Sequence, residues 1–226
     1  MIKVNTVSLP PPECRPEVAS TKEKFEFLLN FLILKIELFL RSSIGRGIND
    51  ISPGLVQGPV PIGATVANLD NATPVFASSF LNQYYAGIMP SIVGNDERHL
   101  LSKIALYEGG VFGALRAELN ARVNLTVPPF NFTVGILTNL TAQLANQLAR
   151  CGVKDEGLIV PLQLGAENRT RSNVVPGDVN SLAYARSARE IMRIAYTTGN
   201  ASRPGGLFPQ GLKGEIPRRI RTLNLS

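Results

Sequence analysis

Residues 25–40 read FEFLLNFLILKIELFL, an apolar run with only a few polar residues in it. At helical spacing the apolar side chains form two stripes. One contains Phe25, Leu28, Leu29, Leu32, Ile36 and Phe39, and the other contains Phe27, Phe31, Leu34 and Leu38. A helix that is apolar on most of its circumference is buried among other helices or in lipid. The run therefore predicts either the central helix of a bundle or a membrane-embedded helix.

The length and ends of this helix favour the bundle over a membrane or signal-anchor helix. Ser20 and Glu23 have the spacing of a capping box, which predicts the helix start just before the run. Sixteen residues at about 1.5 Å each span roughly 24 Å, which is less than the ~30 Å of a bilayer core. Lys35 and Glu37 also place charges near its C-terminal end. We therefore expect no integral membrane segment.

The composition is that of a globular protein with its own core. The chain has 226 residues, of which 44% are hydrophobic and 18% charged, and a net charge of +6. The basic residues are spread out except for Arg218, Arg219 and Arg221, which we interpret as a solvated tail. There is no Trp and no patch of interleaved aromatic and basic residues, so nucleic-acid binding is not expected. An acidic cell-wall polysaccharide fits the charge as a partner.

Cysteines and glycosylation signals bear on the compartment. Cys14 and Cys151 are too few for a disulfide scaffold or a zinc cluster, but they are candidates for one bridge. Asn-x-Ser/Thr triplets are far more frequent than the roughly two that chance predicts. They begin at Asn71, Asn124, Asn131, Asn139, Asn168 and Asn200, with another at Asn224 near the end. This excess favours a secreted glycoprotein of the cell wall, or a vacuolar one, although residues 1–19 show no apolar signal-peptide core.

The pattern along the chain predicts an all-α protein in three parts. Residues 1–19 are a Pro-rich lead, residues 20–150 a helical bundle, and residues 151–226 an irregular, loop-rich C-terminal extension packed on the bundle. Besides the first helix, apolar periodicity and capping signals predict helices over about 75–89, 96–122, 134–150 and 187–196.

Irregular loop sequences add a family resemblance. The run CGVKDEGLIVPLQLGAENRT at 151–170, together with NSLAYARSAREIMRIAYTTGN, PGGLFPQGLKGEI, PPFNFTVG and PIGATVANLDN, closely resembles plant desiccation-related proteins of the ferritin-like group. The resemblance covers about 20–73 and 80–216. It implies a ferritin-like bundle, an extracytoplasmic location and a role in drying or osmotic stress. Between about Thr73 and Phe76 the chain lacks a segment that in this family forms a bundle helix, so the bundle is expected to be degenerate or truncated.

A ferritin-like dimetal site takes a Glu from each of two helices and a Glu-x-x-His pair from each of two others. This chain has a single histidine, His99, which follows Glu97 by only two residues. Two such pairs are therefore excluded. Glu37 and Glu108 are left as candidate ligands of a degenerate iron or manganese site. Each also has an ordinary alternative role. For Glu37 it is an ion pair with Arg41, one helical turn further on, and for Glu108 it is a structural ion pair.

These observations predict a stress-associated protein that acts through its surface, with no enzymatic activity and no cofactor. One alternative is a metal-binding or oxidase-type ferritin-like protein that uses Glu37 and Glu108. A second alternative is a module that binds acidic cell-wall polysaccharide. Because the resemblance implies that one bundle helix is missing, the apolar faces of the first helix are expected to lack a cover. Marginal stability, a homo-oligomer or an exposed apolar groove is the expected result.

Overall fold

The structure is a computed structural model and describes residues 11–53, 82–154 and 157–223. Within these ranges the chain is helical and contains no β-strand; the only strand-like pairings are isolated bridges such as that between Thr126 and Thr133. The predicted all-α class is confirmed.

The first helix, α1 (Thr21–Ile44), begins at the predicted capping box. The Ser20 hydroxyl accepts from the backbone N–H of Glu23 at 3.3 Å, and the Glu23 carboxylate accepts from the N–H of Ser20 at 2.6 Å. At the other end, Gly45 adopts a left-handed conformation with φ of 69°, and its N–H bonds the carbonyl of Arg41. Local sequence thus sets both ends of the helix.

Only part of the apolar surface of α1 is covered by the described residues. The stripe through Phe27, Phe31, Leu34 and Leu38 is buried. On the other stripe Leu28 is buried, whereas Ile36 and Phe39 are 45% and 37% exposed.

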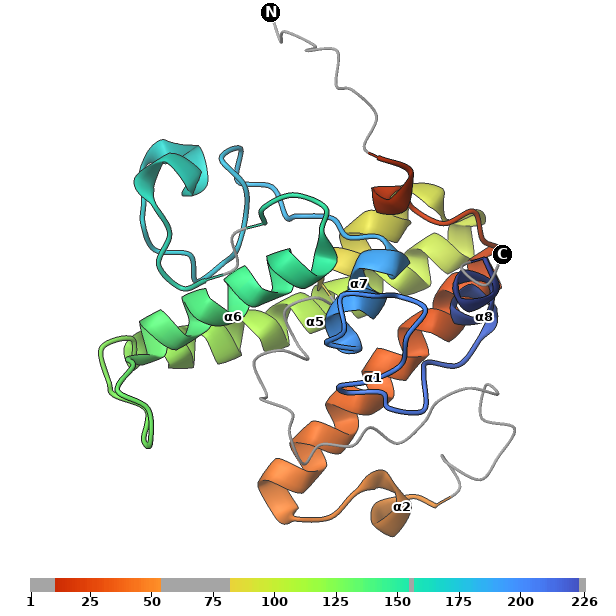
Figure 1. The fold of residues 1–226 in the computed structure, drawn as a ribbon, viewed down its shortest axis with the longest axis horizontal. Coiled ribbons are helices and arrows are strands. Elements are labelled where there is room, and N and C mark those ends of the chain that lie inside the picture. Colours follow the sequence, from red (N-terminus) through yellow and green to blue (C-terminus); the bar gives the residue numbers. More distant parts are fainter. Residues whose placement is uncertain (1–10, 54–81, 155–156, 224–226) are drawn as a thin grey trace, which may run out of the picture.

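Two long helices form the antiparallel pair at the other side of the molecule. They are α5 (Asn95–Ala121) and α6 (Val134–Ala149), which lie side by side and are joined by the loop at 122–133 (Figure 1). Both were predicted. The short α2 (Ile48–Ile51) follows α1 and was not predicted. Residues 82–88 are helical and continue into the turn Met89–Ser91, while the earlier part of the helix predicted at 75–89 lies outside the described residues.

The C-terminal region contributes α7 (Ala188–Ala195), as predicted, and α8 (Glu215–Thr222). The interpretation of the terminal arginines as a solvated tail is wrong. Arg218 and Arg219 lie on α8, which packs against α1 and buries Ile216 and Ile220. Pro217 does not prevent this helix because it lies in the first turn, where no intrahelical N–H bond is lost.

A single hydrophobic core joins the bundle to this C-terminal region. Phe27 of α1 packs on Tyr84 with ring centroids 4.9 Å apart, and Phe31 packs edge-on against Phe208 at 5.5 Å. Residues of α7 and α8 belong to the same buried cluster. The described parts of 20–150 and 151–223 therefore share one core.

Candidate functional site

The interior of the bundle holds a buried ion pair between α1 and α5. Lys35 Nζ donates to Glu108 Oε2, and the two residues are only 7% and 8% exposed. Lys35 lies one helical turn after Phe31, so its side chain is directed toward the same interior, where Nζ is 5.7 Å from the centroid of the Phe39 ring. Each charge compensates the other, and either one alone would be costly to bury.

Tyr85, from the helical residues 82–88, lies close to this pair. Its side chain is buried, and its hydroxyl makes no hydrogen bond within the described part of the chain. Burial raises the pKa of the Tyr85 phenol, and the negative charge of Glu108 adds to the rise. Tyr85 is therefore a neutral phenol at any physiological pH.

Glu37 is fully buried at the other end of α1 and has a structural task there. One carboxylate oxygen accepts from Arg41 Nε at 2.9 Å, and the other accepts from the backbone N–H of Ile48 at 2.9 Å. Gly47 lies so close that an added Cβ would be 2.7 Å from the carboxylate. Glu37 thus fastens the end of α1 to α2, and the ion pair proposed for it with Arg41 is present.

The structure does not bring Glu37 and Glu108 together. Lys35, which holds Glu108, is two residues from Glu37 on α1, and residues at that spacing lie on different faces of a helix. Nowhere in the described ranges do three His, Cys, Asp or Glu side chains group as metal donors, and His99 is exposed. Each candidate carboxylate already has a cationic partner. These donors therefore do not fit a ferritin-like dimetal centre. A metal at Glu37 or Glu108 stays a prediction, and the described part of the chain supplies no further ligands for it.

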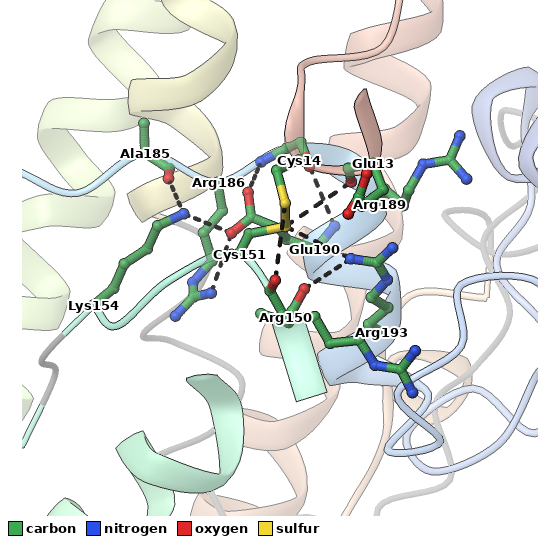
Figure 2. The surroundings of a disulfide bond; sticks show 12 residues. Glu13, Cys14, Arg150, Cys151, Lys154, Ala185, Arg186, Arg189, Glu190 and Arg193 are labelled. Carbon is green, nitrogen blue, oxygen red and sulfur yellow. Dashed lines mark hydrogen bonds and ion pairs between the residues drawn. A yellow bond between two sulfur atoms is a disulfide. The ribbon is translucent and has the colours of Figure 1, made fainter. Parts of the chain in front are cut away.

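A disulfide ties the N-terminal lead to the end of α6. Cys14 and Cys151 are joined with an S–S distance of 2.03 Å and Cα atoms 5.5 Å apart (Figure 2). Arg193 of α7 lies against the bridge, donating to the carbonyl of Ala149 at 2.8 Å and contacting Cys151 Sγ at 3.6 Å. Three segments far apart in sequence meet at this point.

Two acidic side chains, one buried and one half-buried, lie at the start of α7 beside the disulfide. Glu190 completes a capping box with Ser187 and is buried between Lys154 and Arg186 (Figure 2). Glu17, from the lead, accepts from two free N–H groups of the first turn of α7, those of Ala188 and Arg189, at 3.0 and 2.9 Å. Desolvation raises the pKa of the Glu17 carboxyl even so.

The glycosylation signals differ in accessibility. Four of the predicted sites are exposed, namely Asn124, Asn131, Asn168 and Asn200. Asn139 is half-buried on α6, and Asn71 lies outside the described residues. None of the described helices has the length and apolarity needed to cross a bilayer.

Two curated proteins resemble this chain over most of its length. A protein of Nesocodon mauritianus named ferritin-like catalase Nec2 is 32% identical, in an alignment that covers 88% of this chain and 85% of Nec2. The chain belongs to the plant ferritin-like family. A second member, the desiccation-related protein PCC13-62 of Craterostigma plantagineum, is 26% identical over 88% of this chain and 86% of its own length. No protein-family model and no solved structure matches.

These relatives confirm the predicted resemblance and correct one prediction. A ferritin-like bundle of the desiccation-related group was expected, and one relative is named ferritin-like while the other is named desiccation-related. The expectation that the protein has no enzymatic activity is wrong as a family inference, because a member of this ferritin-like family at 32% identity is named a catalase. The count of histidines argued against one type of metal site, and it did not bear on other arrangements.

The alignments also show that these ferritin-like relatives have internal residues that this chain lacks. The alignment to Nec2 extends over 264 positions, more than the 226 residues of the chain. This is the kind of difference predicted next to Thr73, although residues 73–76 lie outside the described ranges.

Sequence reasoning missed the residues that complete the interior. Lys35 was noted only as a charge in an apolar run, and Tyr85 is simply one residue of the helix predicted over about 75–89. The one available signal was that Lys35 and Glu108 are opposite charges at positions where their helices are otherwise apolar. Glu17 gave no signal, because its partners at the start of α7 are more than 170 residues away.

Proposed function

We propose that the protein acts in the plant response to water loss as an extracellular glycoprotein. The relation to a desiccation-related protein over 88% of the chain carries the stress role. The disulfide between Cys14 and Cys151 supports the location, because such bonds persist in oxidising compartments and are rare in the cytosol. The exposed Asn-x-Ser/Thr sites at Asn124, Asn131, Asn168 and Asn200 are available for glycans.

The test follows the protein through a cycle of drying and rewatering. Immunoblots of apoplastic wash fluid and of the remaining cell contents should show a rise on drying, confined to the wash fluid. A glycosidase should increase the mobility of the band. A constant level through the cycle would contradict the stress role, and a protein found only inside cells would contradict the location.

The same proposal includes two surface partners. Leu106 and Tyr107 of α5 are 78% and 72% exposed, which supports self-association, and the net charge of +6 supports binding to acidic polysaccharide. Light scattering over a range of concentrations should show a dimer or larger. Retention on polygalacturonate should be lost at roughly 0.5 M salt, where charges are screened beyond about 4 Å.

A second candidate function is the decomposition of hydrogen peroxide, favoured by the name of Nec2. The described carboxylates do not fit a dimetal centre, so the reaction is tested without assuming one. Oxygen release from peroxide is measured on protein produced with manganese or with iron, alongside its metal content.

The matched variants for this test are both on α5. Loss of activity in Glu108→Gln that circular dichroism shows to be folded, but not in Glu118→Gln, whose carboxylate is exposed, would place the reaction near the bundle interior. Absence of oxygen release with either metal would remove this candidate.

A further inference from the structure

The described part of the N-terminal lead, residues 11–19, lies on the surface of the molecule. None of these residues is buried, and Val18 is 96% exposed. The one turn in this segment, Pro12–Cys14, has no side-chain cap. Burial of apolar surface therefore contributes little to holding the lead in place, and its position against α7 depends on specific attachments.

Two of these attachments reach the end of α6 and the start of α7. One is the Cys14–Cys151 bridge. The other is the Glu17 carboxylate, which accepts from the N–H groups of Ala188 and Arg189 at 3.0 and 2.9 Å. Desolvation raises the pKa of the Glu17 carboxyl in spite of these bonds, so its ionised form is less favourable here than in water. Loss of the bridge would leave the lead with this weakened hold on α7.

The bridge is accessible, and a fixed positive charge lies beside it. Both cysteines are half-buried rather than buried. Arg193, itself only 9% exposed, donates to the carbonyl of Ala149 at 2.8 Å and lies 3.6 Å from Cys151 Sγ (Figure 2). The bond to Ala149 fixes the guanidinium next to this sulfur.

The charges around Arg193 favour an anion at the adjacent sulfur. Burial lowers the pKa of Arg193, and the positive charges of Arg189 and Arg150 lower it further. Glu13 and Glu190 offset part of this effect. A thiolate formed beside Arg193 would compensate its charge, and nearby arginines are among the features that stabilise thiolates in proteins.

The two sulfurs of the bridge differ in their surroundings. Cys151 Sγ has the Arg193 guanidinium beside it. Cys14 Sγ instead faces the carbonyl of Arg150, at 3.9 Å. A cationic neighbour lowers the pKa of a thiol, and a thiol of lower pKa leaves faster when a disulfide is cleaved. Cys151 is therefore the better leaving group, and an incoming thiolate is expected to attack Cys14.

We propose that the Cys14–Cys151 bridge is a redox switch, opened by an external dithiol, that releases the lead from α7. A thiolate of the dithiol attacks Cys14 Sγ, the bond between the two cysteines breaks, and Cys151 leaves as a thiolate beside Arg193. The second thiol of the reductant then displaces Cys14, so the dithiol becomes a disulfide and two electrons pass to the protein. Of the two protons of the dithiol, one ends on Cys14 and one in solvent. The switch does not rest on the function proposed above.

The first test measures the reduction of oxidised, full-length protein by dithiothreitol without denaturant, followed by alkylation and mass spectrometry. The folded wild type should be reduced completely. Arg193→Gln should slow reduction about tenfold, because Cys151 loses the charge that makes it a good leaving group. Arg193→Lys should restore most of the rate. The control Arg122→Gln, which removes an exposed arginine paired with Glu118, should leave the rate unchanged.

The second test asks whether reduction releases the lead. Hydrogen exchange at the N–H groups of Ala188 and Arg189 should accelerate about tenfold or more in the reduced wild type, because their bonds to Glu17 are lost. The N–H of Ile136, which donates to the Thr133 hydroxyl at the start of α6, is the control and should exchange at the same rate in both forms. Circular dichroism verifies that the reduced protein is folded.

The third test identifies the thiolate in the reduced wild type and needs no variant. At about pH 6, Cys151 should react with iodoacetamide before Cys14, because only a thiol of lowered pKa is appreciably ionised there. The proposal is overturned if the bridge is reduced only after the protein unfolds, or if folded Arg193→Gln is reduced as fast as the wild type. It is also overturned if Cys14 reacts first, or if exchange at the start of α7 is the same in both forms.

Discussion

Lys35 and Glu108 neutralise each other in the interior of the bundle, although they are 73 positions apart in the sequence. In a ferritin-like bundle, carboxylates at the interior of the helices hold metal ions. Here the positive charge beside Glu108 is a lysine ammonium, which the chain itself supplies. Glu108 is therefore neutralised by the chain itself, and this gives the first prediction.

Lys35→Met should destabilise the protein by about 3–5 kcal/mol, because it leaves Glu108 buried without a partner. The double variant Lys35→Met with Glu108→Leu should recover most of the loss, since an apolar pair can replace a buried ion pair. Urea unfolding measures both. Lys22→Met is the control, because Lys22 is exposed and its pair with Glu26 should contribute at most about 0.5 kcal/mol. Similar losses of stability in Lys35→Met and Lys22→Met would contradict the assigned role of the buried pair.

Features that depend on neighbours within one turn were predictable, and the others were not. The capping boxes at Ser20 and Ser187 predict where their helices begin, because a capping box involves only the next three residues. By contrast, the partner of Glu108 could not be read from the sequence, since any lysine or arginine on another helix would have served. The helix α8 was missed because its buried stripe consists of little more than Ile216 and Ile220.

The Cys14–Cys151 bridge closes a segment of 137 residues, so its removal should be costly. Replacing both cysteines with serine should lower the free energy of unfolding by about 3–5 kcal/mol, because the unfolded chain regains the conformations that a long closed loop excludes. Guanidinium unfolding measures the loss. A reductant should produce a loss of similar size in the wild type and none in the double variant. If the mature protein lacks this bridge, a reductant will leave the free energy of unfolding of the wild type unchanged.

Glycans should occupy only the accessible Asn-x-Ser/Thr sites. Asn124, Asn131, Asn168 and Asn200 are exposed, whereas Asn139 is half-buried and packs so closely on Gly157 that a Cβ there would lie 1.9 Å from its Oδ1. A branched sugar cannot be accommodated at that contact. Glycopeptide mass spectrometry of protein secreted from plant cells should find glycans at exposed sites and none at Asn139. High occupancy of Asn139 would show that α6 does not pack against residue 157 as described.

Two carboxylates of the N-terminal region should have opposite effects on stability as the pH changes. Burial raises the pKa of Glu17 in the folded state, so its contribution is present below the unfolded pKa of about 4.5 and is lost as the pH rises through the folded value. The bond from the Ser20 N–H lowers the pKa of Glu23, so its contribution is present above about 4.5 and is lost as the pH falls through the folded value. The contributions of Glu17 and Glu23 to the free energy of unfolding should therefore change with pH in opposite directions.

The measurement compares Glu17→Gln and Glu23→Gln with the wild type by urea unfolding between about pH 3.5 and 7. The stability advantage of the wild type over Glu17→Gln should shrink as the pH rises, because the variant no longer has a buried charge to form. Its advantage over Glu23→Gln should grow over the same range, since only the ionised carboxylate accepts fully from Ser20. Slopes of the same sign for both variants would mean that Glu17 is not buried against the start of α7, and hence that the disulfide does not hold the lead where the structure places it.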